Sequence, residues 1–215
     1  MSRMLVLGNK RYSSWSLRGY LALKMANLPF DEVVVPLMTD ETHAEITKHA
    51  PEAPARVPLL IENEHAIWDS ISIMEYAAEM AEEKALWPDD RFKRAEARSI
   101  VAEMHAGFTA LREFIPMDLS RTLPYSTLPD AVEEDVTRIM AIWKRCRERH
   151  NQEGPYLFGE ASLADVAYAP VVIRFLSRSL PLDDILSDYC NAVLDLPGFA
   201  EWRDAAEKEE WVYEQ

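Results

Sequence analysis

Residues 4–26 read MLVLGNKRYSSWSLRGYLALKMA, and two patterns follow one another in this stretch. The apolar run 4–8 predicts a buried strand, because it is short and continuous. After it, Leu17, Leu21 and Met25 recur at the spacing of one face of a helix. The chain is therefore predicted to begin with a strand that leads directly into a helix.

Three serines lie at the junction between this strand and this helix: Ser13, Ser14 and Ser16, in the sequence YSSWSLR of residues 12–18. The first turn of a helix presents unpaired N–H groups and the positive end of the helix dipole, so it stabilises an anion such as a thiolate. A serine at this place also has an ordinary role as the N-cap of the helix. The stretch alone leaves both interpretations open.

The composition is that of a globular protein with an acidic surface. The chain has 215 residues, 48% of them hydrophobic, and a formal net charge of −14. This charge argues against nucleic acids and anionic membranes as main partners. No run approaches the roughly 18 apolar residues of a membrane helix, and the apolar run at the N-terminus is too short for a signal peptide. We expect a cytoplasmic protein.

The two cysteines, Cys146 and Cys190, do not form a C-x-x-C pair, and we expect reduced, partly buried thiols. The five histidines are scattered, and no pair has metal-ligand spacing with a carboxylate or cysteine nearby. The sequence therefore predicts no metal.

The first part of the chain mixes predicted strands with predicted helices. A βαβ unit makes its two strands parallel, and a hairpin follows across the turn Asn63–Glu64. This order, βαβ-α-ββα, is that of a thioredoxin-like domain. The predicted elements are a strand at 4–8, a helix at 14–26, a strand at 31–37, a helix at 39–49, strands at 57–62 and 65–68, and a helix at 70–82.

The rest of the chain is predicted to be helical. It begins after the charged stretch 82–90, which contains Pro88 and is interpreted as a linker between domains. The fold class is therefore α+β, with domains at 1–82 and 92–215 and a linker at 83–91. The predicted helices are 91–121 with an interruption near Pro116, 130–150, 162–179 with a kink at Pro170, 182–194 and 197–208.

Two further motifs carry possible chemistry. Arg56-Val57-Pro58 opens a predicted strand with a proline, which predicts either an ordinary edge or a cis bond that turns the backbone of Val57 toward an extended peptide. Asp69-Ser70 precedes an apolar helical run, so Ser70 is a natural N-cap or part of a carboxylate-binding helix terminus.

Taken in this order, the motifs resemble the cytosolic glutathione S-transferase family. Its members carry a serine motif at the first helix, X-Val-Pro at the third strand, an acidic residue and a serine at the next helix, and an all-helical second domain. The stretch SSWSLR, residues 13–18, is similar to the Ser-Ser-Cys-Ser-Trp-Arg motif of serine-type, zeta-like bacterial members. Trp15 replaces the cysteine, which argues against a cysteine-based reductase.

The resemblance covers essentially the whole chain. DSISI at 69–73 matches the family's acidic-Ser-Leu-Ala-Ile stretch, and SLAD at 162–165 matches the internal capping box that begins a buried helix. The resemblance implies that Ser13 donates a hydrogen bond to the glutathione sulfur, with Ser14 as the alternative. Tyr12 is a weaker competitor.

The resemblance also implies which residues hold the rest of glutathione. The main chain of Val57 would pair with the cysteinyl part, and Pro58 would be cis. Ser70 and Asp69 would hold the γ-glutamyl end, and Arg56 is the candidate for the glycine carboxylate.

The second substrate is expected between the two domains. Its candidate residues also have ordinary interpretations, namely core packing for the apolar ones and a solvated helix face for the arginines. Arg178 falls where zeta members carry an arginine linked to dicarboxylate substrates, and Arg174 lies one turn before it. The candidates are Trp15, Met104, His105, Phe108, Arg112 and Arg178.

The resemblance implies a homodimeric, cytoplasmic detoxification enzyme that uses glutathione as cosubstrate and no metal. It would activate glutathione as a thiolate for attack on an electrophilic small molecule. Two alternatives stay open. One is a glutathione-dependent isomerase of the maleylacetoacetate type, and the other is a non-catalytic protein that uses the same fold for binding.

Overall fold

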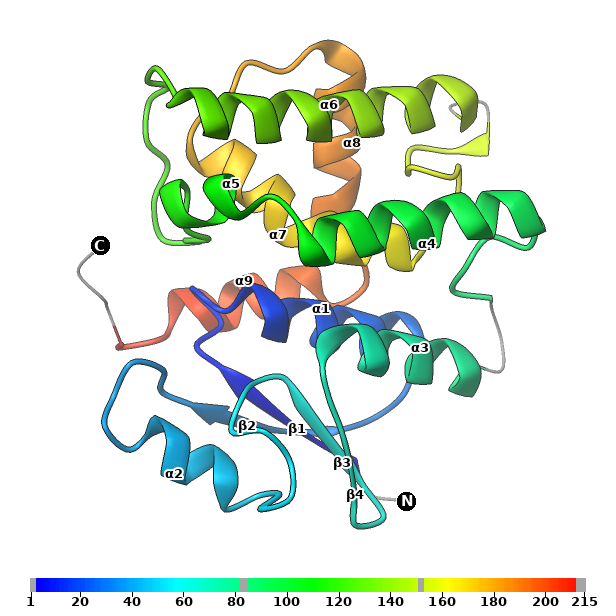
Figure 1. Cartoon of the computed structure of the whole chain (residues 1–215). Coiled ribbons are helices and arrows are strands. Elements are labelled where there is room, and N and C mark those ends of the chain that lie inside the picture. The colour runs from blue at the N-terminus through cyan, green and yellow to red at the C-terminus, as the bar shows by residue number, and fades with distance from the viewer. Residues whose placement is uncertain (1–2, 82–84, 151–152, 212–215) are drawn as a thin grey trace. The chain divides into compact units, whose positions relative to one another are not determined.

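The computed structural model describes residues 3–81, 85–150 and 153–211 (Figure 1). The chain divides into two compact units, one of Met1–Lys84 with Pro197–Gln215 and one of Ala85–Leu196. The predicted helical domain, 92–215, differs from this division at its C-terminal end, because the last helix belongs to the first unit. Residues 83 and 84 of the predicted linker lie outside the described residues.

The first unit contains a four-stranded sheet in the order β2-β1-β3-β4. Strand β1 runs parallel to β2 and antiparallel to β3, which forms a hairpin with β4. The predicted βαβ unit and hairpin of a thioredoxin-like domain are therefore confirmed. The strands are β1 (Arg3–Gly8), β2 (Asp31–Val35), β3 (Leu59–Glu62) and β4 (His65–Ile67).

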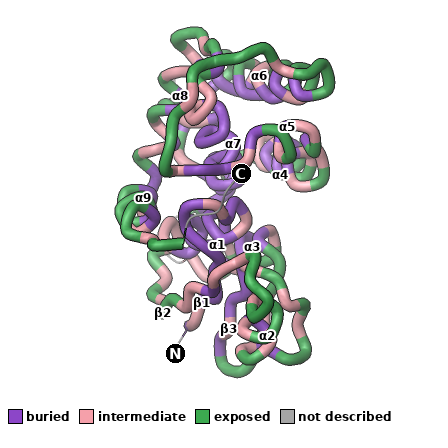
Figure 2. Tube along the Cα trace, turned by 90° about the vertical axis from the view of Figure 1, so that its left-hand side faces the viewer, coloured by how far each residue is buried: buried purple, intermediate pink, exposed green. Residues whose placement is uncertain are grey.

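Helices cover both faces of this sheet, with α1 and α3 on one side and α2 on the other (Figure 1). Side chains alternate along β1, so Val6 packs in a cluster with Ile46 of α2 while Leu5 and Leu7 point to the opposite face. Helix α1 is buried along most of its length (Figure 2). The helices of this unit are α1 (Ser14–Met25), α2 (Thr42–Thr47), α3 (Ser70–Met80) and α9 (Phe199–Glu207).

The second unit is a helical bundle around α7, which is buried over nearly all its residues (Figure 2). The ring of Trp143 contacts those of Tyr168, Phe175 and Tyr189, with centroids 4.9–5.7 Å apart. These aromatic contacts join three helices into one core. The helices are α4 (Arg91–Ala106), α5 (Thr109–Phe114), α6 (Asp130–His150), α7 (Leu163–Ser177) and α8 (Asp184–Leu194).

The predicted helix 91–121 is interrupted earlier than expected. Helix α4 ends at the C-cap Gly107, and Phe108 has a left-handed backbone with φ of +58°. The guanidinium of Arg112 donates to the carbonyls of Met104, His105 and Gly107, which satisfies the end of α4. Because glycine readily ends a helix, the break falls here and not only at Pro116. Helix α6, by contrast, spans the predicted range.

The expected capping box begins α7. The Ser162 hydroxyl accepts from the N–H of Ala164, and the Asp165 carboxylate accepts from the N–H and hydroxyl of Ser162 at 2.8 and 3.0 Å. The other oxygen of Asp165 accepts from the N–H of Leu157 at 3.1 Å. Burial raises the pKa of Asp165 to about 6, against the effect of these donors. The carboxylate therefore joins a loop to the buried start of the central helix.

None of the helices in the described ranges has the length and apolar character needed to cross a membrane.

We predict that Asp165→Asn lowers the free energy of unfolding by about 2 kcal/mol at neutral pH, because the new amide NH₂ opposes a buried N–H donor. Denaturant unfolding measures this loss, with Asp184→Asn, an exposed change in the first turn of α8, as the control. Equal losses in the two variants would contradict the role given to Asp165.

Candidate functional site

The serine motif lies at the N-terminus of α1, as predicted. Ser13 is the N-cap, and its hydroxyl oxygen accepts a long hydrogen bond from the N–H of Ser16 at 3.4 Å. The hydroxyl of Ser13 donates to the hydroxyl oxygen of Ser16 at 2.8 Å. Ser13 and Ser14 are 6% and 9% exposed, so both lie just beneath the surface.

Ser16 connects the strand to the helix. It is fully buried, and its hydroxyl oxygen also accepts from the N–H of Gly8, the last residue of β1, at 2.9 Å. Ser16 therefore has a structural role, because it joins the end of β1 to the start of α1. Ser13 is held in place by a group that is itself fixed to the sheet.

Trp15, the residue that replaces the cysteine of the related motif, is partly exposed in the first turn of α1. The guanidinium carbon of Arg18 lies 4.6 Å from the centre of its ring, and Arg18 is only 3% exposed. A cation over an aromatic face is attractive, so this contact orients the Trp15 ring beside the serines. The sequence analysis missed this pair, although the spacing of three residues on a helix is its signal.

Val57 and Pro58 form the loop before β3, and the peptide bond between them is cis, as the resemblance implied. Among the described residues, the backbone groups of Val57 have no hydrogen-bond partner, and pairing with β1 begins only at Leu59. Gly19 of α1 lets this loop come close, because a Cβ there would stand 3.2 Å from the Pro58 ring. The backbone of Val57 can thus pair with an extended ligand.

Asp69, and not Ser70, is the N-cap of α3. The Asp69 carboxylate accepts from the N–H of Ile71 at 3.0 Å, and Ser70 is the first residue of the helix. The prediction of Ser70 as N-cap is wrong, because the carboxylate one residue earlier already occupies that position. Ser70 is 1% exposed, and its hydroxyl has no hydrogen-bond partner within the described part of the chain.

An unsatisfied buried hydroxyl at a helix N-terminus indicates a ligand-binding position. Burying a hydroxyl without a partner costs free energy, so native proteins rarely keep one without a function. The hydroxyl of Ser70 can donate to an anionic group, and the dipole of α3 favours such a group there.

The structure brings these features together around α1. The side chains of Pro58 and Ile73 both lie against Gly19, so the cis-proline loop and the first turn of α3 meet the same helix. Arg56 is exposed in the loop before Val57. The first unit therefore combines two helix N-termini and one extended, unpaired stretch of backbone, which suits a short acidic peptide with a thiol.

The candidates in the second unit have mostly structural contacts. Met104 is 1% exposed in the core, Phe108 occupies the left-handed turn, and the His105 carbonyl accepts from Arg112. Arg178 lies 5.8 Å from the centre of the Phe114 ring. The expected core packing of Met104 is confirmed.

Arg112 and Arg174 are held inside this unit. Burial lowers the pKa of both guanidinium groups, that of Arg174 to about 10 with a contribution from the charge of Arg112. Arg174 donates to the carbonyl of Ile115 at 2.5 Å. The charge of Arg112 thus acts on Arg174, while the carboxylate of Asp135 raises the pKa of Arg112 itself against the effect of burial.

The cysteines are unsuited to nucleophilic chemistry. Both are buried, and burial raises the pKa of Cys146 to about 11 and of Cys190 to about 12. The thiol form dominates at neutral pH, and the thiolate is the nucleophile. Within the residues that the structure describes, no group of three histidine, cysteine or acidic side chains could hold a metal ion.

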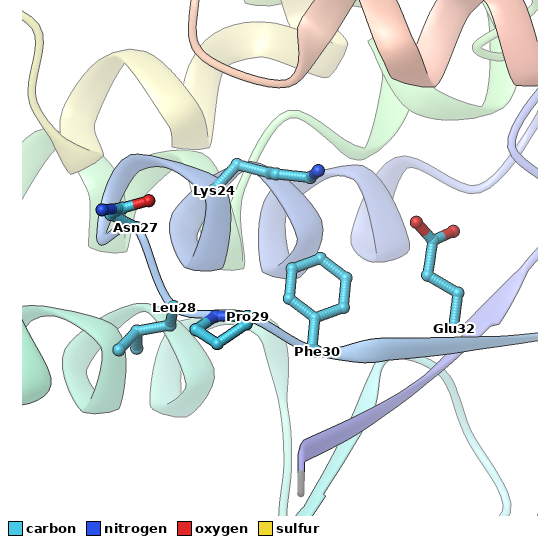
Figure 3. A pocket seen from close by; sticks show the side chains of 6 residues that line it. All are labelled: Lys24, Asn27, Leu28, Pro29, Phe30 and Glu32. Carbon is cyan, nitrogen blue, oxygen red and sulfur yellow. The ribbon is translucent and has the colours of Figure 1, made fainter.

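A separate pocket of about 500 Å³ lies at the other end of α1 from the serine motif (Figure 3). Its wall includes Lys24, whose ammonium binds Glu201 at 2.6 Å and lies 5.8 Å from the centre of the Phe30 ring. None of the predicted site residues lines it. The lining residues are Lys24, Asn27, Leu28, Pro29, Phe30 and Glu32.

Comparison with known proteins agrees with this arrangement. Residues 12–80 match the family model for the N-terminal domain of glutathione S-transferases, and residues 129–205 match the model for their C-terminal domain. The chain is 26% identical over 189 residues to a probable maleylacetoacetate isomerase of Caenorhabditis elegans, and the match covers 86% of each chain.

Two solved structures show the same fold. A glutathione transferase homologue from Burkholderia with bound glutathione has a TM-score of 0.72 and 21% identity, over 97% of this chain and 100% of that chain. A maleylacetoacetate isomerase from Anaeromyxobacter dehalogenans has a TM-score of 0.66 and 22% identity, over 95% of this chain and 92% of that chain.

We predict different effects on stability for two neighbouring substitutions at the start of α3. Asp69→Ala removes a helix cap and lowers the free energy of unfolding by about 1 kcal/mol. Ser70→Ala removes an unpartnered hydroxyl and leaves the free energy of unfolding unchanged or raises it by about 0.5 kcal/mol. Denaturant unfolding of both variants checks this; a large loss with Ser70→Ala would mean that its hydroxyl has a partner in the fold.

Proposed function

Because the chain belongs to the glutathione S-transferase family, we propose that Ser13 stabilises the thiolate of glutathione for attack on an electrophilic small molecule. Glutathione is an extended tripeptide with one thiol and two carboxylates. The first unit offers a hydroxyl at the N-terminus of α1, together with backbone groups of Val57 and a hydroxyl of Ser70 that have no partner in the described part of the chain.

The hydrogen bond between Ser13 and Ser16 carries this proposal. In the structure the Ser13 hydroxyl donates to the Ser16 hydroxyl oxygen. Both groups are hydroxyls, so the bond can reverse, and Ser16 then donates to Ser13. The Ser13 hydrogen becomes free for a sulfur, while Ser16 still accepts from the N–H of Gly8. Ser13 can thus bind a thiolate without leaving its place at the end of the helix.

The size of the effect follows from the electrostatics. A free thiol has a pKa of about 8.5, and each unit of depression corresponds to about 1.4 kcal/mol in favour of the thiolate. One hydrogen bond to the charged sulfur together with the N-terminus of α1 supplies about one to two units. A substantial thiolate fraction at neutral pH is the result.

The remaining contacts to glutathione follow the same logic. The backbone of Val57 would pair with the cysteinyl residue, with the cis bond to Pro58 setting its direction. Ser70 would donate to the γ-glutamyl carboxylate beside Asp69, and Arg56 would reach the glycine carboxylate. The unpartnered hydroxyl of Ser70 supports the first carboxylate position.

The residues that contact the second substrate are a separate proposal. Trp15 and Arg178 are candidates with partly exposed side chains, as are His105 and Arg112. Met104 and Phe108 are buried candidates in the second unit, and Arg112 would supply positive charge.

We predict that Ser13→Ala lowers kcat/KM with chlorodinitrobenzene about 10- to 100-fold near neutral pH, because the thiol pKa rises by one to two units. The acid limb of the pH profile should move to higher pH by the same amount, while the glutathione dissociation constant stays within about twofold. Ser14→Ala should change kcat/KM by less than about threefold.

Steady-state kinetics and calorimetry measure these values. Ser13→Thr is the matched control, since it keeps both a hydroxyl and a helix cap. If Ser14→Ala abolishes turnover and Ser13→Ala does not, Ser14 is the residue that serves the sulfur.

A second candidate function is glutathione-dependent cis–trans isomerisation of a maleylacetoacetate-type substrate. The similarity to the probable isomerase of Caenorhabditis elegans favours it. Such a substrate carries carboxylates that a cationic pocket would hold.

Maleylacetone distinguishes the two chemistries, because isomerisation regenerates glutathione whereas conjugation consumes it. An isomerase should convert maleylacetone at constant glutathione concentration, and Arg178→Ala should lower this rate about tenfold without changing glutathione affinity. An unchanged rate would exclude Arg178 from substrate binding.

We also propose a cytoplasmic homodimer, which the family resemblance supports. Light scattering should give the mass of two chains. The non-catalytic alternative predicts saturable glutathione binding with no turnover of any electrophile, which the same assays would reveal.

A further inference from the structure

The segment after α9 returns to the loop that precedes Ser13. The Glu209 carboxylate accepts from the backbone N–H of Lys10 at 2.6 Å through one oxygen and from that of Arg11 at 3.0 Å through the other. Hydrogen bonds to a charged acceptor are among the stronger ones in proteins. Residues at opposite ends of the sequence are thus joined inside the first unit.

The attachment is reciprocal. The guanidinium of Arg11 donates to the carbonyls of Ala206 and Glu209 at 3.3 and 3.0 Å, although Arg11 is only 8% exposed. These carbonyls lie at and beyond the C-terminal end of α9, where a cation is favourable because the helix dipole is negative there. The loop therefore satisfies the end of the helix, and the segment after the helix holds the loop.

Trp202 provides a third attachment. Its indole N–H donates to the carbonyl of Lys10 at 2.9 Å, and the side chain is fully buried against the ring of Tyr20 in α1. Both backbone polar groups of Lys10 are therefore bound by the C-terminal segment. The ammonium of Lys10 also pairs with Glu32 of β2.

The turn connects these contacts to the serine. The carbonyl of Asn9 accepts from the N–H groups of Tyr12 and Ser13 at 3.2 and 2.8 Å, so Lys10 and Arg11 form the apex of a turn that closes on Ser13. A displacement of the apex changes the position of the N-cap. Rates of enzymes are sensitive to displacements of about 1 Å at a reacting group.

We propose that Glu209 is a positioning residue for Ser13, acting by holding the Lys10–Arg11 turn through its two backbone hydrogen bonds. This inference rests on the proposed role of Ser13. Glu209 touches neither glutathione nor the electrophile in this account. It fixes the geometry in which the Ser13 hydroxyl meets the sulfur.

The chain contains a matched control, Glu201, in the helix that precedes Glu209. Glu201 accepts from Lys24 at 2.6 Å and from the Tyr20 hydroxyl at 3.3 Å, and Lys24 lines the pocket at the far end of α1. Glu201 attaches α9 to the first unit as Glu209 does, but not at the serine loop. Glu201→Gln therefore tests whether any loosening of α9 affects catalysis.

The test compares Glu209→Gln with Glu201→Gln in the full chain. A glutamine at 209 keeps one acceptor and turns an amide NH₂ toward the other N–H. We expect Glu209→Gln to lower kcat with chlorodinitrobenzene about tenfold with KM for glutathione within about twofold, and to move the acid limb of kcat/KM to higher pH. Glu201→Gln should keep both constants within about twofold.

Amide hydrogen exchange reports on the turn itself. The N–H groups of Lys10 and Arg11 should exchange at least about tenfold faster in Glu209→Gln, and Glu209→Asp should fall between this variant and the wild type. Thermal melts confirm that each variant is folded at the assay temperature.

Different results would contradict the positioning role of Glu209 and the proposed function. The positioning role would be overturned if the wild type is active and Glu209→Gln has the same kcat. It would also be overturned if Glu209→Gln and Glu201→Gln lose the same fraction of kcat. A wild type that binds no glutathione and turns over no electrophile would instead overturn the proposed function.

Discussion

The hydrogen bond between Ser13 and Ser16 is the interaction on which the candidate site depends. Ser16 is fixed to the end of β1 through the N–H of Gly8, so the start of α1 is fixed to the sheet. The N-cap is thereby placed by buried groups and not by the loop alone. A hydroxyl in this position has both a rigid support and an available hydrogen after one rotation.

The N-termini of α1 and α3 differ in an instructive way. At α1 the hydroxyl of Ser13 has partners in the fold. At α3 the carboxylate of Asp69 caps the helix, and the hydroxyl of Ser70 has no hydrogen-bond partner among residues 3–81, 85–150 and 153–211. In the proposed function, capping and ligand binding are divided between Asp69 and Ser70 at α3, but are combined in Ser13 at α1. If Ser13 has the proposed role, its substitution affects both stability and chemistry, and the threonine control separates the two.

Much of the fold was predictable from the sequence because strong periodicity dictates it. The strand-to-helix stretch 4–26, the hairpin and the range of α6 all follow local patterns that tertiary packing reinforces. Gly107 is itself a sequence signal for the end of a helix. The apolar residues on either side of it continue at helical spacing, so the break was not predicted there. The cap at Asp69 was missed because aspartate and serine are both good caps, and only the backbone geometry decides between them.

Long-range contacts set the limit of prediction. No local pattern shows that Glu209 meets Lys10 and Arg11, or that the last helix belongs with the first unit, because these contacts span almost the whole sequence. The same holds for the stacking of Arg18 on Trp15, whose spacing permits the contact without requiring it. The residues that position a site are harder to predict than the residues that form it.

The ionisation of the thiol of bound glutathione tests the central claim most directly. The ultraviolet absorbance of the thiolate, followed against pH with the protein saturated, gives the pKa of the bound thiol. The account predicts a midpoint about one to two units below the free value of about 8.5 in the wild type, and a return toward that value in Ser13→Ala. A midpoint in the wild type equal to that of free glutathione would contradict it.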